Sequence, residues 1–182
     1  MTRAQLEHAI RAACDVSGDR EVWVFGSQAI LGEHPDAPSA LRRSIEVDIA
    51  PRNHPERVDA IDGVLGELST FHQTHDFYVH GVPIDTAQLP AGWQVRTYRL
   101  QNHNTRQLTG WCVEGHDLAA SKLAAFRDKD RDFVRVLLVE RLIDADVLLE
   151  RVALMMELEP EPRERMERWI HALRADLSDS AP

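Results

Sequence analysis

Two acidic residues separated by one position, Glu46 and Asp48, are the strongest candidates for chemistry in this sequence. Polar and apolar residues alternate through the run Ser44 to Ala50, which predicts a β-strand. Side chains alternate across a strand, so the two carboxylates are expected on one face. The opposite face is expected to carry the apolar residues Ile45, Val47 and Ile49. Neighbouring carboxylates repel unless they are solvated or share a cation, so the pair indicates either a solvated strand face or a Mg²⁺ site.

A glycine and a serine, Gly26 and Ser27, follow the hydrophobic run Val22 to Phe25 and precede the short helical run Gln28 to Leu31. This order predicts a strand, a tight turn and a helix. Backbone N–H groups in such a turn can receive a triphosphate, and a glycine permits its close approach. An ordinary strand-to-helix turn has the same pattern, so the phosphate interpretation depends on the acidic pair downstream.

Basic residues recur at helical spacing in the C-terminal third of the chain. Lys122 and Lys129 lie seven residues apart, so on one continuous helix they would share a face, with Asp130 beside the second lysine. Such cations can meet the phosphates of a nucleotide. The alternative is a solvated helix surface, because charges of both signs alternate from Arg127 to Arg131.

A third carboxylate would complete a metal site, and Asp85 is the nearest candidate, on a strand expected over residues 84–87, where it could equally cap a turn. Three histidines, His72, His75 and His80, have poor ligand spacing and are expected at the surface or in turns, with no metal role. The tryptophans are expected in the core, because each has apolar neighbours: Trp23, Trp93, Trp111 and Trp169.

The whole-chain composition limits the classes of function. With 182 residues and 43% hydrophobic residues, the chain is long enough for one well-packed core. Its formal charge of −9 means that any nucleic-acid contact requires a local basic patch. Cys14 and Cys112 are far apart, which argues against a disulfide framework or a zinc site. The lack of a long apolar stretch predicts no membrane contact, and a cytoplasmic location is expected.

The elements that must position these residues alternate between helices and short strands before the chain becomes helical. A first helix is expected through residues 6–13, and a second behind Pro55. The second helix is expected to bury an apolar stripe formed by Val58, Ile61, Val64, Leu65 and Leu68. Further strands are expected at 77–82, 84–87, 95–100 and 108–113, and helices at 117–127, 132–141, 144–158 and 161–177. This order predicts an α+β protein, with a mixed sheet and flanking helices over residues 1–115 and a helical region over 116–182 packed on that core.

The two motifs together resemble a known superfamily. Phe25-Gly26-Ser27, a loop, and then the strand with Glu46 and Asp48 resemble the polymerase-β-type nucleotidyltransferase pattern, with Glu in place of the commoner Asp as the first acid. Three further segments resemble the DUF6036 branch of the AbiEii-like toxins: residues 24–32, residues 89–93, and residues 116–123 continuing through Lys129 and Asp130. The resemblance spans about residues 20 to 158.

The resemblance implies a polymerase-β-like core followed by a C-terminal helical bundle, and transfer of a nucleoside monophosphate from an NTP in the presence of Mg²⁺ or Mn²⁺. It implies metal binding by Glu46, Asp48 and Asp85. It implies phosphate contacts by Gly26, Ser27, Lys122, Arg127 and Lys129. The implied catalytic set is Glu46, Asp48, Lys122 and Asp130, the last positioning Lys122 or the metal.

Relatives in this family modify tRNA 3′ ends as toxins of toxin–antitoxin pairs, so tRNA and a cognate antitoxin protein are the implied partners. A local basic surface would then be needed, and several arginines are candidates for it: Arg42, Arg43, Arg96, Arg99 and Arg106. Two alternatives stay open. One is an inactive nucleotide-binding or antitoxin-binding relative, and the other is an enzyme that modifies a small molecule or a protein hydroxyl.

Overall fold

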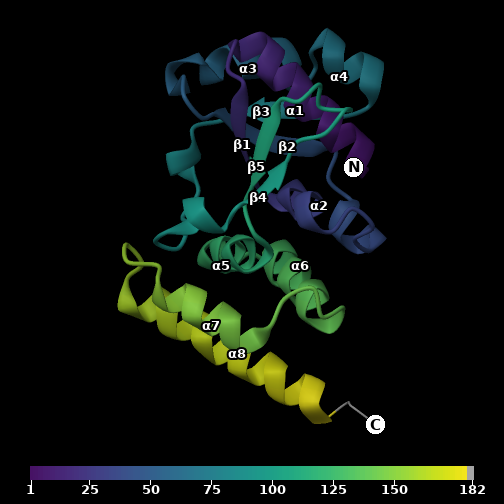
Figure 1. Cartoon of the computed structure of the whole chain (residues 1–182). Coiled ribbons are helices and arrows are strands. Elements are labelled where there is room, and N and C mark those ends of the chain that lie inside the picture. The colour runs from purple at the N-terminus through teal and green to yellow at the C-terminus, as the bar shows by residue number, and fades with distance from the viewer. Residues whose placement is uncertain (180–182) are drawn as a thin grey trace. The chain divides into compact units, whose positions relative to one another are not determined.

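A computed structural model describes residues 1–179, in which the chain divides into two compact units. The first unit consists of Met1–Ala87 and Arg96–Glu114. The second consists of Gln88–Val95 and the chain from Gly115 onward. Figure 1 shows the sheet in the first unit and the long helices in the second. The predicted packing of the helical region on the core stays a prediction.

A five-stranded mixed sheet forms the centre of the first unit, with the strand order β3-β2-β1-β5-β4. Its strands are β1 (Glu21–Phe25), β2 (Glu46–Pro51), β3 (Tyr78–Gly81), β4 (Tyr98–Leu100) and β5 (Thr109–Cys112). β1 is antiparallel to β2 and parallel to β5, β2 is parallel to β3, and β4 is antiparallel to β5. The predicted α+β class and mixed sheet are therefore confirmed.

Helices of the first unit cover one face of this sheet. α1 (Arg3–Ser17) begins with a capping box between Thr2 and Gln5 and contacts β1 and β2. A Cβ on Gly110 of β5 would overlap the side chain of Ile10, which shows how closely α1 approaches the strands. The strand residues on this face are buried: Val22, Val24, Val47, Ile49 and Val79. Alternation therefore directs the neighbouring residues of each strand, including Glu46 and Asp48, to the opposite face.

The remaining elements of the first unit are short. α2 (Ile30–Glu33) follows the 3₁₀ turn η1 (Ser27–Ala29), and α3 (Val58–Leu65) is followed by α4 (Thr70–His75). The other 3₁₀ turns of this unit are η2 (Ser39–Arg42), η3 (Pro55–Arg57) and η4 (Ile84–Thr86). α3 packs on β3 and α1, and buries Val58, Ile61 and Leu65.

The second unit is helical. It contains η5 (Trp93–Arg96, the last residue of which belongs to the first unit), α5 (Gly115–Ala125), α6 (Asp128–Val139), α7 (Ala145–Ala153) and α8 (Pro160–Asp179). α5 contacts α6, α7 and α8, and the segment before η5 is tied to the end of α7 by a backbone hydrogen bond from Ala91 N to Leu154 O (2.9 Å). Among the described residues, none of the helices combines the length and the apolar character that crossing a membrane requires.

Four sequence expectations are wrong in detail. Residues 84–86 form the turn η4 and not a strand. Ile45 precedes β2 and is 48% exposed, so the apolar face begins at Val47. The stripe of α3 ends at Leu65, because the helix stops at Gly66; Val64 and Leu68 are exposed. The tryptophans are half-buried rather than core residues: Trp23, Trp93, Trp111 and Trp169.

Candidate metal site on the open sheet face

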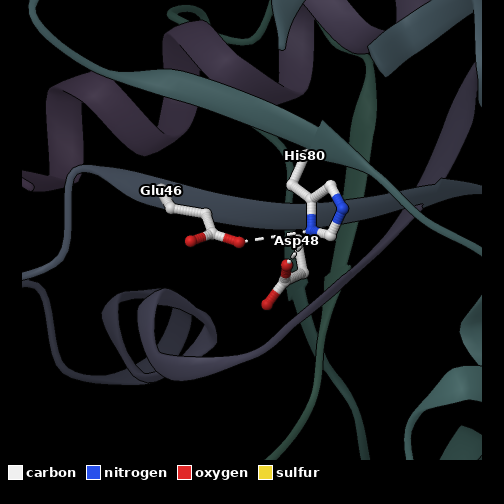
Figure 2. A group of neighbouring side chains, drawn as sticks. All are labelled: Glu46, Asp48 and His80. Atoms are coloured by element: carbon white, nitrogen blue, oxygen red, sulfur yellow. Dashed lines mark hydrogen bonds and ion pairs between the residues drawn. The ribbon is translucent and has the colours of Figure 1, made fainter. Parts of the chain in front are cut away.

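Three side chains that can bind a metal meet on the sheet face opposite α1. Glu46 and Asp48 come from β2, and His80 comes from the parallel strand β3, where it is the register partner of Asp48. Each offers one ligand atom, and these atoms lie within 4.8 Å of one another (Figure 2). The predicted sharing of one face by the two acids is confirmed.

Hydrogen bonds hold the three side chains in this arrangement. His80 Nδ1 lies 2.9 Å from Asp48 Oδ1 and 3.2 Å from Glu46 Oε1, so one nitrogen faces both carboxylates (Figure 2). Tyr78, the register partner of Glu46, donates its hydroxyl to Glu46 Oε2 at 3.0 Å. Glu46 is thus oriented from two directions.

The electrostatics of the site favour a positive charge. Burial lowers the pKa of His80, but the hydrogen bond to Asp48 and the charges of Asp48, Glu46 and Asp62 outweigh it, so this pKa lies above its ordinary value. Burial and the hydrogen bond to Glu46 raise the pKa of Tyr78 to about 12. Even with His80 protonated, Glu46, Asp48 and His80 together carry a net negative charge.

The donor set fits a divalent cation. Two carboxylates and one imidazole are ordinary ligands of Mn²⁺ and other divalent ions, with Mg²⁺ preferring the oxygens. Ligands about 2.1 Å from a shared ion lie at most about 4.2 Å apart, so donors already within 4.8 Å need only small side-chain rotations. The side chains of Glu46, Asp48 and His80 are 38%, 26% and 43% exposed, so an ion and its ligand can reach them.

The Gly26–Ser27 turn runs directly beside Asp48. Phe25 pairs with Asp48 across β1 and β2, and Gly26 follows in a left-handed conformation, with φ of 67°. A Cβ at Gly26 would overlap the Asp48 carboxylate, so only glycine fits this position with Asp48 as it stands. The helical segments after the turn are short, with three residues in η1 and four in α2, so backbone N–H groups rather than a long helix dipole would meet a phosphate.

His80 is the third residue of the group that could hold a metal ion, and sequence reasoning did not include it. Its side chain is 43% exposed, as a surface residue was expected to be, but it lies in the strand β3 and not in a turn. Alternation around the buried Val79 could have placed it on the polar face, but its pairing with Asp48 depends on register. Asp85, exposed in η4, does not belong to the group of ligand atoms described above.

Two basic residues of the second unit, Lys122 and Arg127, belong to a cluster that joins two helices. α5 ends at Ala125, Phe126 takes a left-handed φ of 50°, and α6 begins at Asp128. Lys122 and Lys129 therefore lie on different helices and lack the shared face that one continuous helix would give them, and Lys129 is exposed.

Within that cluster, the buried Asp130 carboxylate is the common partner of two cations. Asp130 Oδ1 lies 3.8 Å from Lys122 Nζ, and its Oδ2 accepts a hydrogen bond of 2.5 Å from Arg127 Nε. Lys122 is thereby held in place by the residue that sequence analysis expected to position it. This pairing joins the end of α5 to the start of α6.

Comparison with known proteins places the chain in one family. The model of the family DUF6036, described as "Nucleotidyltransferase of unknown function", matches residues 4–173. No curated protein and no solved structure matches the chain. The mixed sheet with its helices is consistent with a nucleotidyltransferase-like fold.

Proposed function

The chain belongs to the DUF6036 family of nucleotidyltransferases of unknown function, and from this premise we propose that it transfers a nucleoside monophosphate from an NTP to an acceptor hydroxyl. The observation that carries this proposal is the convergence of Glu46, Asp48 and His80 on one half-exposed sheet face. The close approach of Gly26 to Asp48 supports the proposal that the backbone of this turn meets the phosphates beside the carboxylates.

In the proposed reaction the acceptor oxygen attacks the α-phosphorus of the NTP, and the bond from that phosphorus to the β-phosphate oxygen breaks. Pyrophosphate leaves, and the hydroxyl proton passes to water. A divalent cation, Mg²⁺ or Mn²⁺, would neutralise charge on the phosphates and lower the pKa of the attacking hydroxyl. Glu46 and Asp48 would hold that cation, and their fixed orientation on β2 would position the reacting groups.

His80 extends the proposed carboxylate pair to three ligands. Its Nδ1 faces both carboxylates, so a small rotation can turn it toward a cation held between them. The alternative, Asp85 as the third ligand, has weaker support because Asp85 lies in the exposed turn η4. A nitrogen ligand favours Mn²⁺ over Mg²⁺.

Lys122, Arg127 and Lys129 are proposed phosphate contacts on the strength of the family resemblance. Lys122 is 16% exposed and Arg127 58% exposed, so both retain surface that can meet an anion. Asp130 is a positioning residue in this proposal, since its carboxylate contacts both cations.

The proposed acceptor is the 3′ end of tRNA, and the proposed setting is the cytoplasm, with the protein acting as a toxin held in check by an antitoxin. This part rests on the resemblance to the AbiEii-like toxins. A strand end with a free hydroxyl suits a half-exposed site on a sheet face, because no deep pocket has to enclose the acceptor.

The deciding experiment supplies each labelled NTP, with Mn²⁺ or Mg²⁺, to the protein in the presence of total tRNA or total cell protein. We expect label on tRNA, added at the 3′ end, and none with the Asp48→Asn variant. Expression of the wild type should arrest bacterial growth, and Asp48→Asn at equal protein level should relieve the arrest.

Other outcomes would redirect the proposal. Label on protein or on a small molecule would keep the transfer reaction and replace the acceptor. NTP binding in a calorimeter without any labelled product would favour a nucleotide-binding relative without turnover, for which the Glu at position 46 and His80 among the ligands are the motivating features.

A further inference from the structure

Two tryptophans and two arginines lie together on the same sheet face as the acidic pair. The Arg52 guanidinium lies over the ring of Trp23 at 4.7 Å and over the ring of Trp111 at 4.8 Å. The Arg99 guanidinium lies 5.8 Å from the Trp111 ring. These four residues are called the Trp/Arg platform below.

Glu21 connects two members of the Trp/Arg platform by hydrogen bonds. Glu21 Oε2 accepts a hydrogen bond of 2.6 Å from Arg52 Nη1 and one of 3.0 Å from Trp111 Nε1. Trp23 and Trp111 are register partners on the parallel strands β1 and β5. The side chain of Arg52 is still 35% exposed, so a ligand can reach the guanidinium that lies over the two indoles.

The register places the Trp/Arg platform beside the candidate metal site. On β1, Trp23 lies two residues before Phe25, the partner of Asp48, which is about 7 Å along the strand. On β2, alternate residues run from Glu46 through Asp48 and Ala50 toward Arg52 just beyond the strand. The Gly26–Ser27 turn lies at the other end of β1, so Asp48 stands between the turn and the platform.

We propose that the Trp/Arg platform binds the single-stranded 3′ end of the acceptor RNA, an inference that rests on the proposed transfer to an RNA hydroxyl. Unpaired bases stack on arginine planes and on aromatic rings, and arginine also pairs with phosphate. The platform offers both in one surface, across the neighbouring strands β2, β1, β5 and β4.

The geometry of phosphoryl transfer favours the acceptor strand over the NTP base as the occupant. Attacking and leaving oxygens lie roughly in line through the transferred phosphorus. With the leaving pyrophosphate at the Gly26–Ser27 turn, the acceptor approaches from the opposite side of Asp48, which is the side of Trp23 and Arg52. Charge supports the same assignment, since the platform brings two guanidiniums together in a chain of formal charge −9, and the neighbouring Glu21 carboxylate offsets only one of them.

The test measures binding of one tRNA in two forms, intact and trimmed of its single-stranded 3′ end, by fluorescence anisotropy without nucleotide. The key variant is Arg52→Gln. The matched control is Arg165→Gln, because Arg165 also lies over an aromatic ring, that of Phe126 at 4.4 Å, and its loss changes the charge equally. Melting temperatures verify that both variants are folded.

We expect Arg52→Gln to bind intact tRNA about tenfold more weakly than the wild type, as loss of one stacking partner predicts. Arg165→Gln should bind like the wild type, and trimmed tRNA should bind equally weakly to all three proteins. Intact tRNA should also quench tryptophan fluorescence more in the wild type than in Trp111→Phe/Trp23→Phe.

Equal affinity of Arg52→Gln and Arg165→Gln for intact tRNA, or equal affinity of the wild type for intact and trimmed tRNA, would overturn the inference. The proposed function is judged separately, by label transfer and by its loss in Asp48→Asn. If the wild type transfers label to tRNA but Arg52→Gln binds tRNA with unchanged affinity, the platform inference is wrong and the proposed function stands. If Arg52→Gln weakens tRNA binding but the wild type transfers no label, the platform binds RNA and the proposed transfer reaction is wrong.

Discussion

The sheet cluster of Glu46, Asp48 and His80 and the helix cluster of Lys122, Arg127 and Asp130 use similar groups in opposite ways. In the helix cluster one buried carboxylate, 2% exposed, is matched by two cations. In the sheet cluster two carboxylates, each more than a quarter exposed, share one imidazole.

The contrast separates a cluster whose carboxylate is neutralised by neighbouring cations from a cluster that we propose as a metal site. A buried carboxylate needs cationic partners to offset its desolvation, and the helix cluster supplies them across the α5–α6 junction. The second unit repeats this solution at Asp117, which is buried and lies 3.3 Å from Arg151 Nε. The sheet cluster instead concentrates negative charge where solvent reaches it, which stabilises the fold poorly and suits a divalent cation.

The largest effect expected from this comparison is on catalysis. Asp48→Asn should lower kcat/KM for nucleotide transfer about 1,000-fold, because a metal ligand supplies several kcal/mol of transition-state stabilisation. The melting temperature should change little, since the Asp48 side chain is 26% exposed and the substitution also removes repulsion with Glu46. Steady-state kinetics and differential scanning calorimetry measure the two quantities.

Asp59→Asn is the control for that prediction, because Asp59 is an exposed carboxylate in the first turn of α3. It should keep wild-type kinetics. If Asp48→Asn were as active as Asp59→Asn, the sheet cluster would have no role in catalysis. The two clusters would then not differ in function.

The second effect is on stability and concerns the helix cluster. Asp130→Ala should lower the free energy of unfolding by about 3 kcal/mol, because it leaves Lys122 and Arg127 without their buried partner. Arg127→Ala should cost less than about 1 kcal/mol, since that side chain is 58% exposed. Urea denaturation provides both values. A small loss for Asp130→Ala would mean that the carboxylate is kept for ligand binding instead.

The sequence predicted the sheet cluster only in part, and the reason is physical. Alternation within one strand is a local property, so the shared face of Glu46 and Asp48 could be read directly. The addition of His80 depends on the parallel pairing of β2 with β3, which joins residues 32 positions apart. No local pattern specifies that register.

The arrangement of the helix cluster could not be predicted from the sequence for a different reason. The charged run from Arg127 to Arg131 has strong helical character, but the helix breaks at Phe126, a bulky residue with positive φ whose conformation no local propensity predicts. The tryptophans were misplaced because half-buried aromatic residues have the same apolar neighbours in sequence as buried ones. Trp23 and Trp111 are covered by Arg52, a contact that again depends on pairing between strands.

The third prediction concerns metal preference and refines the view of the sheet cluster. His80→Ala should weaken Mn²⁺ binding about tenfold and Mg²⁺ binding less, because an imidazole ligand matters more to Mn²⁺. Isothermal titration calorimetry at fixed pH gives both affinities, and electron paramagnetic resonance counts bound Mn²⁺. His72→Ala is the control, since His72 lies in α4 outside the cluster. Equal losses for the two metals would make His80 a positioning residue for the carboxylates.

The smallest expected effect concerns Asp19, a buried and fully hydrogen-bonded carboxylate of the first unit. It tests whether such a carboxylate stabilises the fold, as Asp130 is expected to do and the sheet cluster is not. Asp19 is 4% exposed and accepts hydrogen bonds from Asn53 N (2.6 Å), Asn53 Nδ2 (2.9 Å), Glu21 N (3.0 Å) and His54 N (3.2 Å). Burial raises the pKa of Asp19, but these bonds outweigh it and hold the pKa below its ordinary value.

A lowered pKa in the folded state means that Asp19 stabilises the protein above the unfolded value of about 3.9 and loses that contribution as the pH falls through the lower folded value. Asp19→Asn should therefore cost about 1–2 kcal/mol of unfolding free energy at pH 7, and the difference from the wild type should shrink toward pH 3. Asp15→Asn is the matched control, because the Asp15 side chain is 58% exposed and its difference should stay small at every pH. Urea denaturation between pH 3 and pH 7 measures these differences. If Asp19→Asn lowered the unfolding free energy equally at every pH, the hydrogen-bonded geometry of Asp19 would matter and its negative charge would not. Asp19 and Asp130 would then have only their burial in common.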